Sequence, residues 1–256
     1  MKNERCLCGK MIDLHSHILP EVDDGSRDME MSLAMARMAV ADGITEMAAT
    51  PHVFSGFGPF QPADSAPMTA ALQARLDAEA IPLLLHPCCE MPLLENYQQL
   101  LRDGRWLSYD AGGKYVLLEM PPIPHGYPIL LRAVKTVGMA GKVPLLAHPE
   151  RLEMLADPAR VQELLAAGAL LQVTSFCYGD NVPGSSMRNR ALLWLERGWV
   201  SVVATDAHRP DRRPPLMSAA ARFVARTMGP AVADALFTAN PRAILGGLPL
   251  PAQPLR

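Results

Sequence analysis

Short apolar runs alternate along the chain with longer segments in which apolar residues recur with the 3.6-residue period of a helix. This alternation is typical of repeated βα units around a parallel sheet. It predicts seven strands, over residues 11–15, 44–50, 81–89, 115–120, 143–147, 170–174 and 200–205. It predicts helices between them over residues 29–41, 67–80, 127–140, 158–167 and 187–197.

Glycines separate several of the predicted helices from the strands that follow. Gly43, Gly141, Gly168 and Gly198 each come just after a helix, where a residue with positive φ commonly ends it. Seven strands with helices between them and no linker favour one α/β domain in the form of a closed or distorted βα barrel. Residues 53–67, rich in Gly, Pro and Phe, predict a mobile loop, and the Pro-rich tail from Gly246 is expected on the surface.

Composition narrows the class of protein. The 256 residues are long enough for one large domain, and 49% hydrophobic with 20% charged residues is ordinary for a globular chain. A net charge of -2 gives no basic field for a nucleic-acid backbone. No apolar stretch reaches membrane-spanning length and none follows the N-terminus as in a secretory signal, so we expect a cytoplasmic protein without membrane insertion.

The cysteines are interpreted as reduced thiols. Their number is odd, at 5, and they lack the paired spacing of a zinc site or a disulfide framework. Cys6 and Cys8 could bind a metal ion, although a frayed terminus is the simpler interpretation.

Ionisable side chains follow nearly every predicted strand. His15 and His17 lie two residues apart at the end of the first strand, so both imidazoles face one point. Asp206 and His208 repeat this spacing after the last strand. In a βα barrel the carboxyl ends of the strands converge on one mouth. The other strand ends contribute the following side chains: His52, Glu90, Glu119 and His148.

Each of these residues, taken alone, could have a purely structural role. A single strand-end His is more often a hydrogen-bonded structural residue, and a single acid is more often a helix cap. Six of seven strands ending in this way favour a metal cluster instead. Imidazole and carboxylate without thiolate suit Mn, Fe or Zn. The candidate ligands are His15, His17, Asp24, His52, Glu90, Glu119, His148, Asp206 and His208.

The charge balance of such a cluster suits a phosphate. Three divalent ions would outweigh the four carboxylates, and two metals about 3.5–4 Å apart can hold a hydroxide and clamp phosphoryl oxygens. Arg151 follows His148 and Arg213 follows His208, and a guanidinium fork matches phosphate oxygens in pairs. The alternative for each arginine is a solvated surface position.

Two other phosphatase designs are excluded by spacing. No Cys is followed six positions later by Arg, as a cysteine phosphatase loop requires, and no two Asp residues lie two apart, as in the usual aspartyl-phosphate motif. Hydrolysis through a covalent enzyme intermediate therefore lacks its nucleophile.

Several segments, in order, carry a family resemblance: HSHILPEVDDG, ATPHV, the isolated Glu90, LLEM, AHPER and ATDAHRPDRRPP. With them the chain resembles the CpsB/CapC branch of the polymerase-and-histidinol-phosphatase (PHP) superfamily, over nearly its whole length. The resemblance implies a distorted seven-stranded βα (TIM-like) barrel. It places a PHP phosphoesterase domain at residues 11–246, between a disordered or variable extension at 1–10 and a Pro-rich tail at 247–256.

The resemblance also assigns roles. It groups the ligands around three metals: His15, His17, Glu90 and Asp206 around the first, Glu90, Glu119 and His148 around the second, and Asp24, His52 and His208 around the third. Arg151 and Arg213 match the family's phosphate-binding arginines, which are the catalytic candidates. His86 and His125 match no ligand position and are expected to be structural or surface residues.

The activity implied is that of a manganese-dependent protein-tyrosine phosphatase of capsule or exopolysaccharide synthesis, with two to three ions per chain and Fe or Zn as alternatives. The expected substrate is the phosphotyrosine-bearing tail of a bacterial tyrosine kinase, attacked by metal-bound hydroxide, and a homo-oligomer is expected. A small-molecule phosphatase of the histidinol-phosphatase type and a non-catalytic regulatory scaffold remain open. The segment VTSFCY at 173–178 and the loop at 54–62 depart from the family pattern and bear on substrate.

Overall fold

The computed structural model describes residues 10–53, 60–93, 97–123, 125–179 and 184–251. Within these ranges the strands pair in parallel and form a three-stranded sheet, in the order β1-β2-β3, and a five-stranded sheet, in the order β4-β5-β6-β7-β8. The strands are β1 (Met11–Ser16), β2 (Ile44–Ala49), β3 (Leu84–Pro87), β4 (Glu90–Pro92), β5 (Tyr115–Glu119), β6 (Val143–Ala147), β7 (Leu170–Thr174) and β8 (Val200–Ala204).

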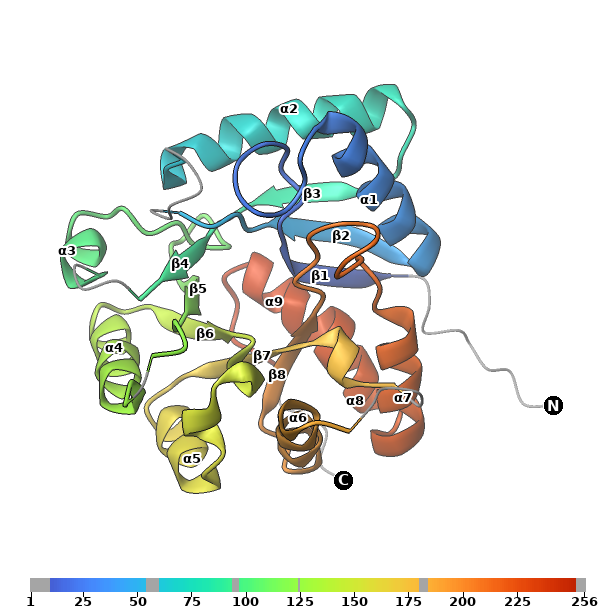
Figure 1. Cartoon of the computed structure of the whole chain (residues 1–256). Coiled ribbons are helices and arrows are strands. Elements are labelled where there is room, and N and C mark those ends of the chain that lie inside the picture. Colours follow the sequence, from blue (N-terminus) through green and yellow to red (C-terminus); the bar gives the residue numbers. More distant parts are fainter. Residues whose placement is uncertain (1–9, 54–59, 94–96, 124, 180–183, 252–256) are drawn as a thin grey trace.

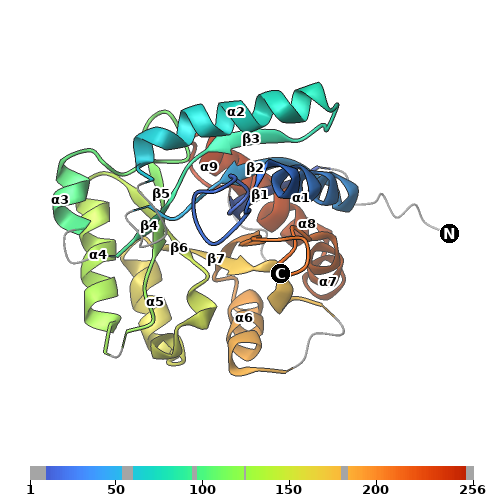
Figure 2. The same ribbon diagram turned by 45° about the horizontal axis from the view of Figure 1, so that its top comes forward.

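Most of the helices lie around the outer side of the strands, as Figures 1 and 2 show. Those predicted from periodicity are present with bounds that agree to within two residues: α1 (Met29–Asp42), α2 (Ser65–Ala78), α4 (Tyr127–Met139), α5 (Pro158–Ala166) and α6 (Ser186–Glu196). In the described part of the chain, no helix is both long and apolar enough to cross a membrane.

Local signals explain where these helices begin and end. The Asp28 side chain accepts a hydrogen bond from the Met31 N–H at 2.8 Å and caps the start of α1. At its other end Gly43, with φ of 96°, donates to the carbonyls of Ala39 and Val40. The other three glycines predicted to end helices also have positive φ.

Several helices were not predicted: α3 (Tyr97–Arg102), α7 (Ser218–Met228), α8 (Pro230–Asp234), a short π-helix (Ala235–Ala239) and α9 (Asn240–Leu245). Gly229 interrupts the C-terminal run, and a proline lies in the first turn of both α8 and α9. The pieces other than α7 have five or six residues each and are too short to display a helical period, whereas α7, with 11 residues, is as long as the predicted α6 and was missed by the prediction.

The predicted third strand, residues 81–89, is shorter in the structure, at Leu84–Pro87, and an additional strand that was not predicted follows it at Glu90–Pro92. β3 pairs with β2, whereas β4 begins at Glu90 and pairs with β5. Between them Cys88 N–H donates to the Ala49 carbonyl and Glu90 N–H to the Pro51 carbonyl, both at 3.0 Å. The chain crosses from one sheet to the other here, and the prediction of a single seven-stranded barrel is not confirmed.

Isolated backbone bridges nevertheless bring the two sheets together at the carboxyl ends of their strands. Ser16 pairs with Ala207 and His52 with Glu90, both in parallel. The His17 N–H donates to the Ala207 carbonyl at 2.8 Å. Strand ends from both sheets therefore meet at one place.

An inner apolar cluster fills the space that both sheets face. It draws alternate strand residues from both sheets, Cys88 and Tyr109 from segments between strands, and Ile244 from α9. The strand residues are Ile12, Leu14, Ala48, Tyr115, Leu117, Leu145, Ala147, Val202 and Ala204. Leu245 of α9 packs against this cluster, as do Val143 and Leu170, which begin their strands. Helix α9 thus covers the amino ends of the strands and leaves the carboxyl ends open for a site. A larger second cluster packs the outer faces of the strands against the helices.

Candidate metal centre

In several strands, the alternate residues that face inward are followed by a carboxylate at the end of the strand. Leu117 belongs to the inner cluster, and Glu119 continues its row two residues later; Ala204 and Asp206 stand in the same relation after β8. Glu90 lies at the first position of β4 and is fully buried. Strand alternation therefore aims these acids into the mouth.

His15, His17, Glu90 and Asp206 converge with all four side chains buried. The two imidazole Nε2 atoms lie 3.3 Å apart. Oδ1 of Asp206 is 3.4 Å from Nε2 of His15 and 3.3 Å from Nε2 of His17. Glu90 places one oxygen 3.4 Å from His15 and the other 3.6 Å from His17. These residues are the ones grouped around the first predicted metal.

Glu90 also reaches the second predicted group. Its Oε1 is 3.0 Å from Nε2 of His148, which lies 4.0 Å from Oε1 of Glu119. The Glu90 carboxylate therefore stands between the first and second groups, where a bridging ligand would lie. His52 approaches this group as well, with its Nδ1 3.0 Å from Oε2 of Glu90 and 3.7 Å from Glu119.

Asp24 is the centre of the third predicted group. Its Oδ1 lies 3.4 Å from Nε2 of His208 and 3.7 Å from Nε2 of His52. Ligand atoms of these three residues and of His17 all lie within 4.8 Å of one another. The structure thus brings all nine predicted ligand residues into one cluster, with His17 and His52 each shared between groups.

The donor set fits divalent cations. Oδ1 of Asp24 and Oε2 of Glu90 are buried and make no hydrogen bond of good geometry among the described residues, although imidazole nitrogens approach them to 3.4 and 3.0 Å. A buried carboxylate oxygen without well-aligned hydrogen bonds is costly unless a cation meets it. Nitrogen and oxygen donors without sulfur suit Mn, Fe or Zn.

The pKa shifts of the clustered side chains also favour the binding of cations. Burial alone would lower the pKa of His15, but the Glu90 and Asp206 carboxylates outweigh it and raise the pKa above its ordinary value. Burial alone would raise the pKa values of Glu90 and Asp206, yet the facing histidines hold both well below the usual range. The cluster therefore has a negative field that attracts positive charge.

The two predicted phosphate-binding arginines lie at the edge of the cluster of candidate metal ligands. Nη2 of Arg151 is 2.5 Å and Nη1 of Arg213 is 2.8 Å from the same atom, Oδ2 of Asp206. Arg213 also approaches Oδ2 of Asp24 at 3.8 Å. Asp206 thus turns one oxygen to the imidazoles and the other to both guanidinium groups.

Comparison with known proteins identifies the family. Residues 11–246 match the family described as "Capsular polysaccharide synthesis, CpsB/CapC". The chain belongs to the CpsB/CapC family.

Named relatives of the CpsB/CapC chain include two phosphatases. It is 34% identical to tyrosine-protein phosphatase YwqE of Bacillus subtilis, over 79% of each chain. It is 31% identical to tyrosine-protein phosphatase CpsB of Streptococcus pneumoniae, over 92% of this chain and 98% of that protein. A solved structure described among "YwqE from Bacillus subtilis and CpsB from Streptococcus pneumoniae, unique metal-dependent tyrosine phosphatases" superposes with a TM-score of 0.84 at 30% identity, covering 96% of this chain and 100% of that chain.

A more distant structure shares the fold alone. An organophosphorus hydrolase mutant from Deinococcus radiodurans superposes with a TM-score of 0.51 at 14% identity, over 94% of each chain. The parallel α/β architecture of this CpsB/CapC protein therefore extends beyond its own family.

Residues behind the ligands fix the orientation of the imidazoles. Nδ1 of His15 lies 2.8 Å from Oε1 of Gln172, and Nδ1 of His17 lies 2.7 Å from Oδ2 of Asp23. Each contact leaves Nε2 directed at the cluster, as in carboxylate–histidine–metal arrangements. The Asp23 side chain also accepts from the His52 N–H at 2.9 Å, so one acid orients two candidate ligands of the CpsB/CapC site.

The sequence interpretation missed Gln172, Asp23 and Asp13. Gln172 is a long polar side chain that follows Leu170 in the inward row of β7, which is a usable signal. Asp23 has no signal beyond its position next to Asp24. Asp13 is fully buried and accepts from the Thr205 N–H at 3.0 Å and from its hydroxyl. Burial raises the pKa of Asp13 to about 6, although the bonds from Thr205 oppose the rise. This pair ties β1 to the turn after β8.

Several residues of the CpsB/CapC site have strained backbone conformations. Among the described residues, six besides glycine have positive φ, and three of these are His148 (32°), Asp206 (52°) and Arg213 (57°). Such conformations cost about 1–3 kcal/mol each and cluster at functional sites. All three of these side chains contact the carboxylates of the cluster or belong to them.

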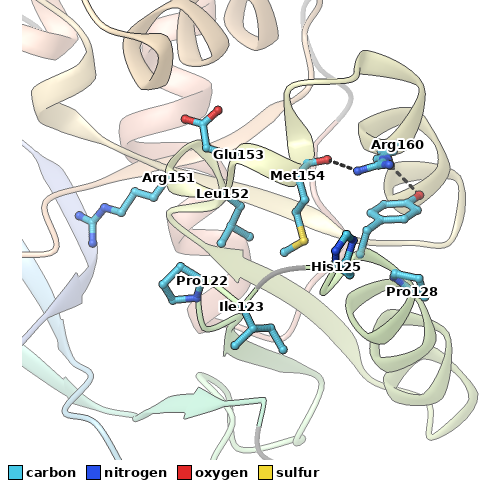
Figure 3. A pocket seen from close by; sticks show the side chains of 10 residues that line it. Pro122, Ile123, His125, Pro128, Arg151, Leu152, Glu153, Met154 and Arg160 are labelled. Atoms are coloured by element: carbon cyan, nitrogen blue, oxygen red, sulfur yellow. Dashed lines mark hydrogen bonds between the residues drawn. The ribbon is translucent and has the colours of Figure 1, made fainter.

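Two cavities flank the arginines. One of about 710 Å³ is lined by apolar residues that include Ile123, Leu152 and Met154, and Figure 3 shows Arg151 at one end with its side chain extending away from them. The other, of about 680 Å³, is lined by three arginines, Arg213, Arg222 and Arg226, and by apolar residues that include Phe176 and Leu216.

The other singled-out residues lie apart from the cluster. His86 pairs with Glu46 at 3.0 Å, and exposed His125 lines the first cavity. Cys88, Cys89 and Cys177 are buried free thiols, which confirms the prediction for these three. Cys6, Cys8 and residues 54–59 of the predicted mobile loop lie outside the described residues.

Proposed function

We propose that this protein is a metal-dependent protein-tyrosine phosphatase that removes phosphate from the tyrosine-bearing tail of a kinase of capsule or exopolysaccharide synthesis. The observation that carries the proposal is the convergence of nine His, Asp and Glu side chains with two arginines at the carboxyl ends of the strands. Membership of the CpsB/CapC family and the names of its relatives support the reaction class.

The proposed cofactor is two to three divalent ions, with manganese as first choice and iron or zinc as alternatives. The first would be held by His15, His17, Glu90 and Asp206, the second by Glu90, Glu119 and His148, and the third by Asp24, His52 and His208. Bound divalent ions supply Lewis-acid charge for the phosphoryl oxygens and lower the pKa of a water.

Arg151 and Arg213 are proposed to bind the phosphate. Both contact Oδ2 of Asp206, whose Oδ1 faces the histidines. A phosphoryl group beside Asp206 is therefore within reach of both guanidinium forks, which would orient it and stabilise charge as the ester oxygen leaves.

Further expectations complete the proposal. Residues 11–246 would form the phosphoesterase domain as a distorted βα barrel, with the kinase tail as partner. Self-association and a cytoplasmic location remain predictions. The histidinol-phosphatase and scaffold alternatives become outcomes of the experiment below.

The test is a substrate panel with defined metals. Chelator-treated protein is reloaded with Mn, Fe or Zn and assayed on a tyrosine-phosphorylated peptide and on histidinol phosphate. We expect activity on the peptide, restored first by Mn and absent in His148→Ala at unchanged circular dichroism. Preference for histidinol phosphate would support the small-molecule alternative, and metal-replete protein inert on every phosphoester would leave only the scaffold.

A further inference from the structure

Phe176 is a large apolar side chain that stays 40% exposed beside the candidate centre. It lies in the 3-10 turn Ser175–Cys177 that follows β7. The residues on either side of it are buried, and the Ser175 hydroxyl donates to the Leu216 carbonyl at 2.8 Å. The turn is therefore anchored, and the exposed ring has a defined place.

That place is next to a proposed phosphate-binding arginine. The guanidinium carbon of Arg151 lies 5.8 Å from the centroid of the Phe176 ring. The same guanidinium group contacts Asp206 at 2.5 Å. The guanidinium group of Arg151 therefore lies near both the carboxylate of Asp206 and the phenyl ring of Phe176.

The cavities indicate the side from which an aromatic substrate would enter. Arg151 extends away from the apolar lining of the first cavity, as Figure 3 shows. Phe176 and Arg213 both line the second cavity, together with Leu216 and Pro214. A phosphate held by the two arginines would thus lie next to the second cavity, whose wall includes the Phe176 ring.

We propose that Phe176 is a specificity-determining residue whose exposed ring packs against the phenyl ring of a phosphotyrosyl substrate. The inference rests on the proposed function and deepens it, because it assigns a preference for aryl over alkyl phosphates to one side chain. Aromatic rings pair with centroids about 4.5–7 Å apart and gain attraction beyond their burial. A phosphoserine side chain offers no ring to pair.

A purely structural role for Phe176 makes a different prediction. If its ring served only to hold Arg151 by a cation–π contact, its removal would weaken the binding of any phosphate. Inorganic phosphate and phenylphosphonate, which is not hydrolysed, separate the two roles because they differ by a phenyl ring.

The experiment compares Phe176→Ala, Phe176→Tyr and the control Leu84→Ala in Mn-loaded full-length protein. Leu84 is 50% exposed on β3 and lines neither cavity. One peptide sequence is used with phosphotyrosine or phosphoserine, and the two inhibitors are titrated calorimetrically. For Phe176→Ala we expect kcat/KM on phosphotyrosine to fall about 10-fold, with less than about 2-fold change on phosphoserine. Phenylphosphonate affinity should fall in parallel, and inorganic phosphate affinity should not.

Phe176→Tyr keeps a ring and should stay within about 2-fold of the wild type. Equal losses on both peptides with weaker inorganic phosphate binding would overturn the inference in favour of a positioning role for Phe176. An unchanged phosphotyrosine rate in Phe176→Ala would overturn it while the phosphatase assignment stands. Wild-type protein inert on both peptides would overturn the proposed function and this inference together.

Discussion

The side-chain oxygen of Gln172 lies 2.8 Å from Nδ1 of His15 and 3.4 Å from the backbone nitrogen of His148. An amide oxygen only accepts, so Nδ1 of His15 is the donor and Nε2 keeps its lone pair for the cluster. Gln172 is fully buried in β7. One neutral side chain thus aligns candidate ligands from β1 and from the end of β6.

Gln172→Ala should therefore weaken metal binding by about 10–100-fold, the range for residues that orient metal-bound histidines. Competition with a chromogenic chelator measures the affinity without any assay of turnover. Gln99→Ala, which removes an exposed glutamine on α3, serves as the matched control. Equal affinities in the two variants would contradict the orienting role.

Gly25 offers a second test, through the loop that carries Asp24. A Cβ at this position would lie 2.2 Å from the carbonyl oxygen of His17 and 2.5 Å from its Cβ. Gly25→Ala must therefore push the loop away from His17, and we expect loss of the ion assigned to Asp24, His52 and His208. Metal content per chain after dialysis, measured by mass spectrometry, checks this.

The control for this variant is Gly184→Ala, because a Cβ there meets nothing within 4 Å. It should keep the wild-type metal content. Full occupancy in Gly25→Ala would show that the close packing on His17 does not set the position of Asp24.

The sequence could predict those residues of the site that a local pattern marks, and it could not predict those whose role depends on contacts between distant parts of the chain. Ligands such as Glu119 and Asp206 were predictable because strand alternation and the strand-end rule are local. Gln172 acts on His15 from 157 residues away, and no local pattern encodes that pairing. The same limit applies to Phe176, whose relation to Arg151 depends on how two turns pack.

The fold likewise contains elements that the sequence could predict and others that it could not. Helices such as α1 and α4 have clear periods and were predicted within a residue or two. The crossing from β3 to β4 depends on which neighbour each strand pairs with, and only the tertiary structure decides that. The inward packing of α9 through Ile244 is likewise a consequence of the assembled core.

Arg151→Ala should lower turnover on phosphotyrosine by about 10²-fold or more if the guanidinium stabilises charge in the transition state. Arg151→Lys should recover only part of this loss, because an ammonium cannot make the paired contacts of the fork. Arg160→Ala is the matched control, since Arg160 lines the same cavity but bonds to the Met154 carbonyl rather than to the cluster. A control as impaired as Arg151→Ala would argue for a general effect of charge.

Metal loading should stabilise the fold. Without ions, the buried carboxylates of Glu90 and Asp206 depend on histidines and arginines for compensation. Ions that bind only the folded chain add about 2.7 kcal/mol at a hundredfold excess over Kd. Thermal unfolding with and without a chelator should therefore differ by several degrees, with a smaller difference in His148→Ala. Coincident curves for the wild type would contradict the proposed cluster.

Alkylation of cysteine should leave catalysis intact, unlike in phosphatases that use a cysteine nucleophile. Burial raises the pKa of Cys177 to about 12, with a further contribution from the Glu150 carboxylate, and burial raises that of Cys89 to about 12. At pH 8 the thiolate fraction of each would be on the order of 10⁻⁴, and the thiolate is the reactive form. Activity on phosphotyrosine is measured after prolonged iodoacetamide treatment of the Mn-loaded protein, with modified sites mapped by mass spectrometry. Inactivation that tracks modification of Cys177, which adjoins Phe176, would place a reactive thiol at the centre and argue against a reaction driven by metal and arginine alone.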